Sequence, residues 1–116
     1  MRREGRCYLS GPITGVPSYM DNFKRYEIDL SNRFGWTIIN PAAVNAEMPD
    51  NTDYEEYIEM SETMMRMCDR IFLMQGWENS KGAKFEREFA IIYGMEVWEE
   101  NSEGEICLTV RGSNNG

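Results

Sequence analysis

The sequence predicts an α/β fold, a three-layer sandwich in which helices cover both faces of a parallel sheet of four to five strands. Short apolar segments with strand character alternate along the chain with segments of helical periodicity, and this alternation typically builds right-handed βαβ units. The segment 70–74 is apolar with almost no polar alternation, as in a strand that is covered on both faces. We therefore expect a flavodoxin-like (Rossmann-like) topology, in which ligands bind beyond the carboxyl ends of the strands.

Apolar patterns and turn residues set the boundaries of the predicted elements. We expect strands at residues 6–10, 36–40, 70–74, 94–98 and 105–110, and helices at residues 18–34, 52–68 and 82–93. Gly11 and Pro12 end the first strand, and Gly35 is expected at the C-cap of the first helix. Residues 41–51 are predicted to form a loop.

The second helix has two possible starting points. Thr52 with Glu55 gives one capping box and Asp53 with Glu56 gives another, and the sequence leaves both open. The third helix follows the buried strand 70–74 after a turn at residues 75–80. Residues 1–110 are expected to form a single domain, and residues 111–116 a flexible tail.

Composition narrows the possible partners of the 116-residue chain. The net charge of −8 argues against binding a nucleic-acid polymer, which needs clustered Lys and Arg. No apolar run approaches ~18 residues, so we expect no membrane partner. The three cysteines lack metal-ligand spacing and favour reduced thiols in a cytoplasmic protein. The chain has no histidine, so proton transfer would fall to Glu, Asp, Tyr, Lys or water.

Glu86 occupies an unusual position on the predicted helix 82–93. At 100° per residue, one apolar arc contains Ala83, Phe85, Phe89, Ala90, Ile92 and Tyr93, and Glu86 falls inside it. Lys84, Arg87 and Glu88 fall on the opposite side. A buried ionised carboxylate is costly unless it has partners or a cavity, so such positions are often functional. The structural alternative is a Glu at the edge of the arc that bonds a neighbouring loop.

Polar and small residues gather after the ends of the predicted strands. The turn 10–15 at the end of the first strand contains Gly11 and Gly15, which let the backbone approach a ligand closely, and Ser10 and Thr14, which offer hydroxyls. Asn40 follows the second strand, and residues 75–80 follow the third. An ordinary strand–turn–helix connection would also explain the first of these turns.

Taken together, the motifs resemble the nucleoside 2-deoxyribosyltransferase superfamily, which includes 2'-deoxynucleoside 5'-monophosphate N-glycosidases. The resemblance covers roughly residues 6–98. It rests on YLSGPITG at residues 8–15, on Ser80-x-Gly82-x-x-x-Glu86-x-x-x-Ala90, and on Cys68-Asp69 before the intervening strand. A small bacterial and phage branch is similar in its YLSGPITG, in Asn-Pro after the second strand, and in GWE-S-KGA.

This resemblance implies a role for several residues. Glu86 matches the nucleophile that attacks the anomeric C1' of a 2-deoxyriboside, and Tyr8 matches the tyrosine that orients it. Tyr8 is equally natural as a core aromatic residue. Ser80 matches a serine near the 5'-phosphate in the monophosphate hydrolases, but it is also a natural N-cap. The implied substrate-binding residues are Ser10, Gly11, Pro12, Asn40, Trp77, Ser80, Gly82 and Ala83.

One position departs from the pattern of the superfamily. Members usually carry an Asp eight residues before the Asp of the third strand, whereas this chain has Ser61. Ser61 is predicted to face inward. Glu62 lies near the edge of the apolar stripe and could substitute only after a small rotation, which the helix geometry disfavours. If nothing substitutes, protonation of the leaving group would slow by ~10²–10⁴-fold.

The resemblance and this departure leave three functions open. The first is cleavage or transfer at the N-glycosidic bond of a 2'-deoxynucleoside or its 5'-monophosphate, with no metal or organic cofactor. The second is a nucleotide-binding protein that senses or sequesters its ligand without turnover. The third is a structural α/β protein with a vestigial pocket. A homodimer or higher homo-oligomer is expected, because partner chains often complete the pocket in the superfamily.

Overall fold

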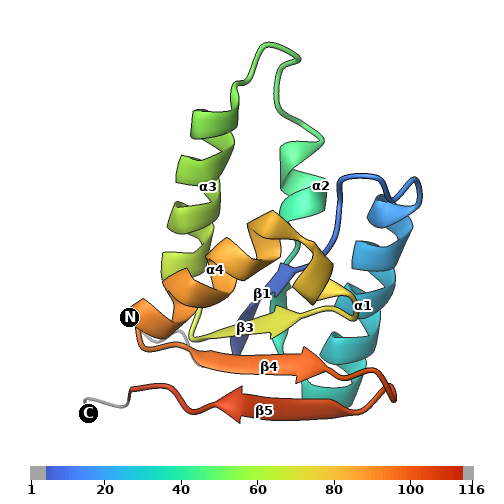
Figure 1. Ribbon diagram of the computed structural model, residues 1–116, viewed down its shortest axis with the longest axis vertical. Helices are drawn as coiled ribbons and strands as arrows, with labels where there is room; N and C mark the ends of the chain where they lie inside the picture. The colour runs from blue at the N-terminus through green and yellow to red at the C-terminus, as the bar shows by residue number, and fades with distance from the viewer. Residues whose placement is uncertain (1–4, 114–116) are drawn as a thin grey trace.

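The computed structural model describes residues 5–113, which form a mixed α/β fold around one five-stranded sheet (Figure 1). The strands are β1 (Arg6–Ser10), β2 (Thr37–Ile39), β3 (Arg70–Leu73), β4 (Glu96–Glu100) and β5 (Ile106–Val110). The helices are α1 (Tyr19–Phe34), α2 (Pro41–Asn45), α3 (Tyr54–Arg66) and α4 (Lys81–Ile92), with a 3₁₀ turn, η1 (Trp77–Asn79), before α4. Within residues 5–113, every helix is too short or too polar to span a bilayer.

The predicted α/β class is confirmed, but the sheet is not wholly parallel. Its strand order is β2-β1-β3-β4-β5, and the first four of these strands run parallel while β5 pairs antiparallel with β4. The connection between β4 and β5 is too short for a parallel crossover, which needs a dozen or more residues. The Asn101 side chain closes this connection by accepting hydrogen bonds from the backbone N–H groups of Glu103 and Glu105. The all-parallel flavodoxin-like topology is therefore not confirmed.

Helices cover both faces of the sheet, as Figure 1 shows. Alternate residues of β1 supply the two cores: Cys7 and Leu9 pack with α1 and α2, whereas Tyr8 packs with α3 and α4. The core on the side of α3 and α4 contains Tyr8, Met64, Met65, Cys68, Ile71, Leu73, Phe89, Ala90, Met95 and Val97. The Ser10 side chain lies on the same face of β1 as Tyr8 and therefore points toward α4.

Helix ends follow the predicted capping residues at several places. Asp53 accepts a hydrogen bond from Glu56 N–H, and the Glu56 side chain accepts from Asp53 N–H, so the second of the two predicted capping boxes is the one that forms. Gly35 caps α1 in the left-handed conformation, with φ of 71°. The N-cap of α4 is Ser80, whose hydroxyl accepts from the backbone N–H of Ala83 at 3.1 Å.

The prediction of a loop over residues 41–51 is wrong at its start, where α2 forms. Pro41 occupies the first turn of this helix, and Asn40 caps it by accepting from the backbone N–H of Ala43 at 3.2 Å. A five-residue helix is too short to produce a periodic signal. The strand predicted over 94–98 is also displaced, to Glu96–Glu100, because Gly94 adopts φ of 72° and turns the chain after α4.

The predicted apolar arc of α4 is wider than the surface that the helix buries. Ala83, Phe89 and Ala90 are buried, whereas Phe85, Ile92 and Tyr93 are 44%, 79% and 49% exposed. The helix contacts β3 and β4 only along a narrow stripe centred on the small residues Ala83 and Ala90. Of the predicted tail, residues 111–113 are described, and Ser113 N–H donates to the Gly94 carbonyl at 2.9 Å. Residues 114–116 lie outside the described residues.

Candidate functional site

The carboxylate of Glu86 lies over the carboxyl-terminal half of β1, on the face of the sheet that α3 and α4 cover. The Tyr8 hydroxyl donates to its Oε2 at 2.7 Å, and the Ser10 hydroxyl donates to its Oε1 at 2.5 Å. Each carboxylate oxygen therefore has its own donor from β1. The Ser61 hydroxyl of α3 lies 3.3 Å from the Tyr8 oxygen and completes a cluster of three hydroxyl groups around one acid.

Burial and hydrogen bonding act on the acidity of Glu86 in opposite directions. Burial raises the pKa of Glu86, while hydrogen bonds from Ser10, Tyr8 and Ser61 lower it, and the balance leaves the pKa above its usual value of 4.5. Within the described part of the chain, no ion pair reaches this carboxylate. The negative charge of Glu86 is therefore stabilised by hydrogen bonds from neutral hydroxyl groups.

Tyr8 remains a proton donor throughout the physiological pH range. Its side chain is 1% exposed, and burial together with the Glu86 charge raises the pKa of Tyr8 well above its usual value of 10.0. A neutral phenol that donates to one carboxylate oxygen fixes the orientation of the carboxylate. The predicted contact between Tyr8 and Glu86 is present, while the catalytic role of the pair stays a prediction.

Local sequence explains how these side chains meet. Residues two apart on a strand share a face, so Tyr8 and Ser10 both point toward α3 and α4. Ser61 lies on the inward face of α3, one turn before the buried residues Met64 and Met65, as predicted. The Ser80 cap fixes where α4 begins and thus the direction in which Glu86 points, back toward β1.

Sequence reasoning missed part of this cluster. Ser10 was predicted to line a substrate site, whereas its hydroxyl binds the Glu86 carboxylate directly. The signal was available in strand periodicity, which places Ser10 on the same face as Tyr8. Glu62 is half-buried and, among the described residues, makes no hydrogen bond to Glu86 or Tyr8. It therefore does not take the place of the inward-facing Ser61.

The turn after β1 and the turn after β3 pack against each other. Gly11 is buried, and a Cβ at this position would lie 2.9 Å from the Cβ and Sδ of Met74, so the packing itself requires glycine here. Pro12 is half-buried and lies against Gly76. Both residues shape the loop beside Ser10, and neither side chain reaches the Glu86 carboxylate by a hydrogen bond.

Two other predicted binding residues have their polar groups engaged within the fold. The Asn40 side chain caps α2 and donates to the Glu27 carboxylate at 3.1 Å, and it is 8% exposed. The Trp77 indole N–H donates to Glu99 at 2.8 Å, and the Arg87 guanidinium lies 5.7 Å from the centre of the Trp77 ring. In this arrangement Asn40 and Trp77 stabilise the loops around the site.

The remaining predicted residues lie at the amino end of α4. Ser80 serves as N-cap and Ala83 is buried beneath the first turn. Gly82 is exposed, and a Cβ there would find only the Ser80 hydroxyl, 4.0 Å away. No steric contact in the described structure requires glycine at this position, so the space in front of the first turn of α4 is open.

Two surface hollows are lined in part by residues of α4, the helix that carries Glu86. One of about 440 Å³ is lined by Tyr54, Glu55, Ile58, Glu59 and Phe85, and the other, of about 360 Å³, is lined by Trp77, Glu78, Lys84, Arg87 and Glu88. Glu86 lines neither hollow. The first lies between α3 and α4 and is mainly aromatic and acidic, whereas the second carries two cations.

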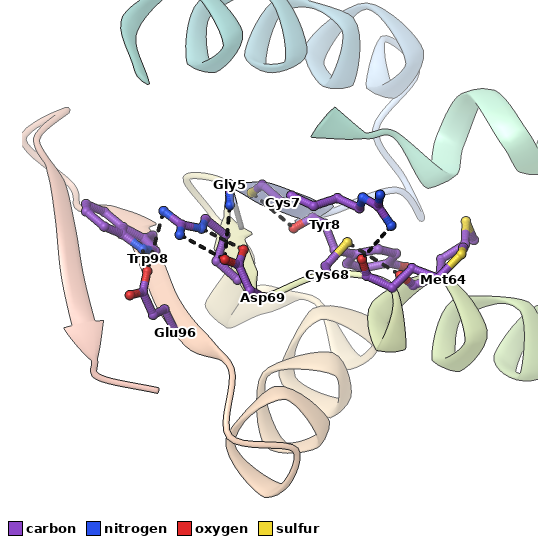
Figure 2. A network of polar contacts seen from close by, with 11 residues as sticks. Gly5, Cys7, Tyr8, Met64, Cys68, Asp69, Glu96 and Trp98 are labelled. Carbon is purple, nitrogen blue, oxygen red and sulfur yellow. Dashed lines mark hydrogen bonds and ion pairs between the residues drawn. The ribbon is translucent and has the colours of Figure 1, made fainter. Parts of the chain in front are cut away.

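A separate polar network ties the amino ends of the strands together, as Figure 2 shows. Asp69 accepts from the backbone N–H of Gly5 at 3.0 Å and from the Arg70 guanidinium at 2.9 Å. Arg70 also lies 3.5 Å from the Glu96 carboxylate. Parallel strands share their polarity, so this end of the sheet is opposite the end that holds Ser10 and Glu86. The network agrees with the predicted structural role of Asp69.

Comparison with known proteins yields one family match. A family model described as "Domain of unknown function (DUF4406)" matches residues 5–99. The matched segment runs from the start of β1 into β4 and includes Tyr8, Ser10, Ser61 and Glu86. No curated protein matches the chain.

Proposed function

The chain belongs to the DUF4406 family, and we propose that it cleaves or transfers the N-glycosidic bond of a 2'-deoxynucleoside or its 5'-monophosphate, with Glu86 as nucleophile. One observation carries this proposal: a half-buried carboxylate near the carboxyl end of β1, whose pKa is raised by burial and which is held by the hydroxyls of Tyr8 and Ser10. Such a carboxylate is oriented without being neutralised by a cation, which is what covalent catalysis at an anomeric carbon requires.

The reaction proceeds in two displacements at C1'. The ionised Glu86 carboxylate attacks C1', the C1'–N bond breaks with its electron pair going to the base, and a deoxyribosyl ester remains on the enzyme. The departing base takes up a proton from solvent. Water then attacks C1', gives a proton to solvent and releases 2-deoxyribose or its 5-phosphate with the free carboxylate, or a second base attacks and gives transfer. In the free protein Tyr8 and Ser10 each hold one oxygen of the attacking carboxylate. Water and the protein's own side chains suffice, so the scheme uses no metal or organic cofactor.

The amino end of α4 supports a nucleotide rather than a free nucleoside. A helix N-terminus offers free backbone N–H groups and a partial positive charge, both of which favour a phosphate. Lys81 and Lys84 lie in the first turn, and exposed Gly82 leaves space there. The motif resemblance to the nucleoside 2-deoxyribosyltransferase superfamily supports the same assignment and, with it, a flavodoxin-like relationship, a homo-oligomer and a cytoplasmic location.

The proposal is tested by incubating the protein with each 2'-deoxynucleoside and its 5'-monophosphate and measuring free base by chromatography. We expect release by the wild type and a loss of at least about 10³-fold in Glu86→Gln. Glu88→Gln is the matched control, since Glu88 is exposed two residues away on the same helix. Absence of release by the wild type, or undiminished release by Glu86→Gln, rejects the proposal.

Ser61 favours a second candidate function, nucleotide binding without turnover. A hydroxyl stands where the superfamily carries a carboxylate, and in the described residues Glu62 does not replace it. Under this alternative, calorimetry detects binding of an intact nucleotide, and mass spectrometry finds no product after prolonged incubation. Breakdown of the bound nucleotide eliminates this candidate.

A further inference from the structure

The groups that surround the proposed nucleophile are poor proton donors. Among the described residues, Glu86 is hydrogen-bonded by the hydroxyls of Tyr8 and Ser10, with the Ser61 hydroxyl beside them. Serine hydroxyls are very weak acids, and burial beside Glu86 makes the Tyr8 phenol a weaker acid than usual. Glu86 itself must be ionised in order to attack. No side chain of this cluster is therefore suited to protonate a departing base.

A leaving group without a proton donor must be stable when it departs. A neutral purine or pyrimidine leaves as an anion unless it is protonated, and missing acid catalysis typically costs 10²–10⁴-fold. A base that already carries a positive charge, such as an N7-alkylated purine, takes the electron pair of the C1'–N bond and leaves as a neutral molecule. The later attack of water on the glycosyl ester releases one proton to solvent, so that charge and atoms balance.

The hollow between α3 and α4 has the chemistry that such a base needs. Tyr54 and Phe85 offer aromatic surface, and Glu55 and Glu59 supply two carboxylates. Aromatic faces and carboxylates both favour a cationic ring over a neutral one. The lining of this hollow contains no Lys or Arg, in contrast to the hollow on the other side of α4.

This hollow lies between the same two helices that carry Ser61 and Glu86, although neither of these residues lines it. Ile58 lies three residues before Ser61, nearly one turn along α3, and Phe85 directly precedes Glu86 on α4. A base held in this hollow would lie within about one helical turn of Ser61 along α3.

We infer that the site acts on N-glycosides whose leaving base carries a positive charge before the bond breaks, with the base held between α3 and α4. This inference rests on the proposed function, because it specifies the substrate class of the same site. Under this inference, position 61 carries no acid because the substrate does not need one, and not because the site has lost its activity.

The test compares two substrates that differ in the charge of the base: 7-methyl-2'-deoxyguanosine 5'-monophosphate and 2'-deoxyguanosine 5'-monophosphate. Release of each base is followed by chromatography and corrected for hydrolysis without enzyme. We expect kcat/KM for the cationic substrate to exceed that for the neutral one by at least about 10²-fold. Activity on the cationic substrate must disappear in Glu86→Gln.

Two sets of variants test the two parts of the inference. Ser61→Asp adds an acid beside the leaving base, and we expect it to lower the cationic-to-neutral ratio by at least about 10-fold, whereas Ser61→Asn leaves the ratio high. Replacing Glu55 and Glu59 together by Gln is expected to lower the same ratio by about 2- to 10-fold. Replacing the exposed Glu47 and Glu103 by Gln makes the same change in net charge away from the hollow and is the control.

The possible outcomes separate this inference from the proposed function. Glu86-dependent cleavage of both substrates with similar kcat/KM overturns the inference and supports the proposed function. Cleavage of neither substrate, together with no release from any 2'-deoxynucleotide, overturns both. A strong preference for the cationic substrate that neither Ser61→Asp nor the double Gln variant reduces overturns the assigned position of the base.

Discussion

Two hydroxyl groups oppose the effect of burial on Glu86. Without donors, burial would raise the pKa of the half-buried Glu86 further and so weaken it as a nucleophile. Ser10 and Tyr8 bind the two oxygens separately, and both bonds strengthen when the carboxylate is ionised. The two serve different needs, since the short serine side chain holds the acid close to β1, whereas the longer tyrosine also fills the core.

Removing either donor is expected to change the pH dependence of the reaction. The rate should rise with pH as Glu86 ionises, and loss of a donor raises the pKa of Glu86 further. In Ser10→Ala and Tyr8→Phe the acidic limb of kcat/KM therefore moves to higher pH, with the larger movement in Ser10→Ala, whose bond is shorter. Above this limb, a loss of about 10-fold is expected for each variant.

The measurement is a profile of kcat/KM against pH for the wild type and both variants. Thr14→Ala is the control, because Thr14 is an exposed hydroxyl residue in the turn that follows Ser10. Acidic limbs that coincide in all four proteins would contradict the assigned role of the two donors.

The sequence predicted which residues form the site better than it predicted which contacts they make. Helical periodicity singled out Glu86, the resemblance to the superfamily paired it with Tyr8, and their hydrogen bond is present. The same reasoning placed Ser10 toward a substrate and gave Asn40 a binding role. Periodicity predicts the face on which a side chain lies, but not which of several nearby partners it will bond. That choice depends on distances of a few tenths of an ångström.

At the scale of elements, predictability followed length. The long helices α1 and α3 repeat their apolar pattern over several turns, and their caps were identifiable in the sequence. The short helix α2 gives no periodic signal. The direction of β5 depends on its connection to β4 rather than on its own composition. The outer part of the predicted apolar arc of α4 is exposed in the structure. An apolar pattern indicates which face of a helix is buried, but not how much of that face the sheet can cover.

Gly82 tests whether the amino end of α4 is kept open for a ligand. Gly82→Ala is expected to stabilise the protein by about 0.4–1 kcal/mol, because alanine loses less conformational freedom than glycine on folding and its Cβ meets no crowding. If a 5'-phosphate binds there, the added methyl group should also raise KM for a 2'-deoxynucleoside 5'-monophosphate by about 10-fold, as loss of ~1.4 kcal/mol would.

Unfolding in urea measures the first effect and steady-state kinetics the second. The corresponding 2'-deoxynucleoside, which lacks the phosphate, is the matched substrate, and its KM should stay the same. An equal change in KM for both substrates, or none for either, would place the phosphate elsewhere.

For the whole molecule, the layered architecture explains why the site lies where it does. Parallel strands direct their carboxyl ends to one edge of the sheet, and the helices that follow begin there. The opposite edge holds the ion pairs of Asp69, Arg70 and Glu96, which join three strands through charged groups. Stabilising charge pairs and the proposed chemistry are therefore separated by the length of the strands. This division was predictable from strand polarity, whereas the individual ion pairs were not.

Burial of the ionised Glu86 carboxylate should also lower the free energy of unfolding of the protein. The pKa of Glu86 is raised in the folded state, so the folded protein binds its proton more tightly than the unfolded chain does. The stabilising contribution of this proton is fully present below the unfolded value, near 4.5, and is lost as pH rises through the higher folded value. At pH 8 the wild type therefore carries an ionised carboxylate in a poorly solvated place, and Gln at this position removes that charge.

We expect Glu86→Gln to be more stable than the wild type at pH 8 by about 0.5–2 kcal/mol, the usual gain when a functional constraint is relieved. Urea unfolding at pH 8 and at pH 4.5 measures this difference, which should narrow at the lower pH because the raised pKa lets the wild-type carboxyl bind more of its proton there. Glu88→Gln, on the exposed side of α4, should show no such convergence. A variant that is less stable than the wild type at pH 8 would mean that the hydroxyls of Ser10 and Tyr8 more than compensate for burial. The hydrogen bonds around Glu86 would then stabilise the fold, and the buried carboxylate would carry no net cost in stability.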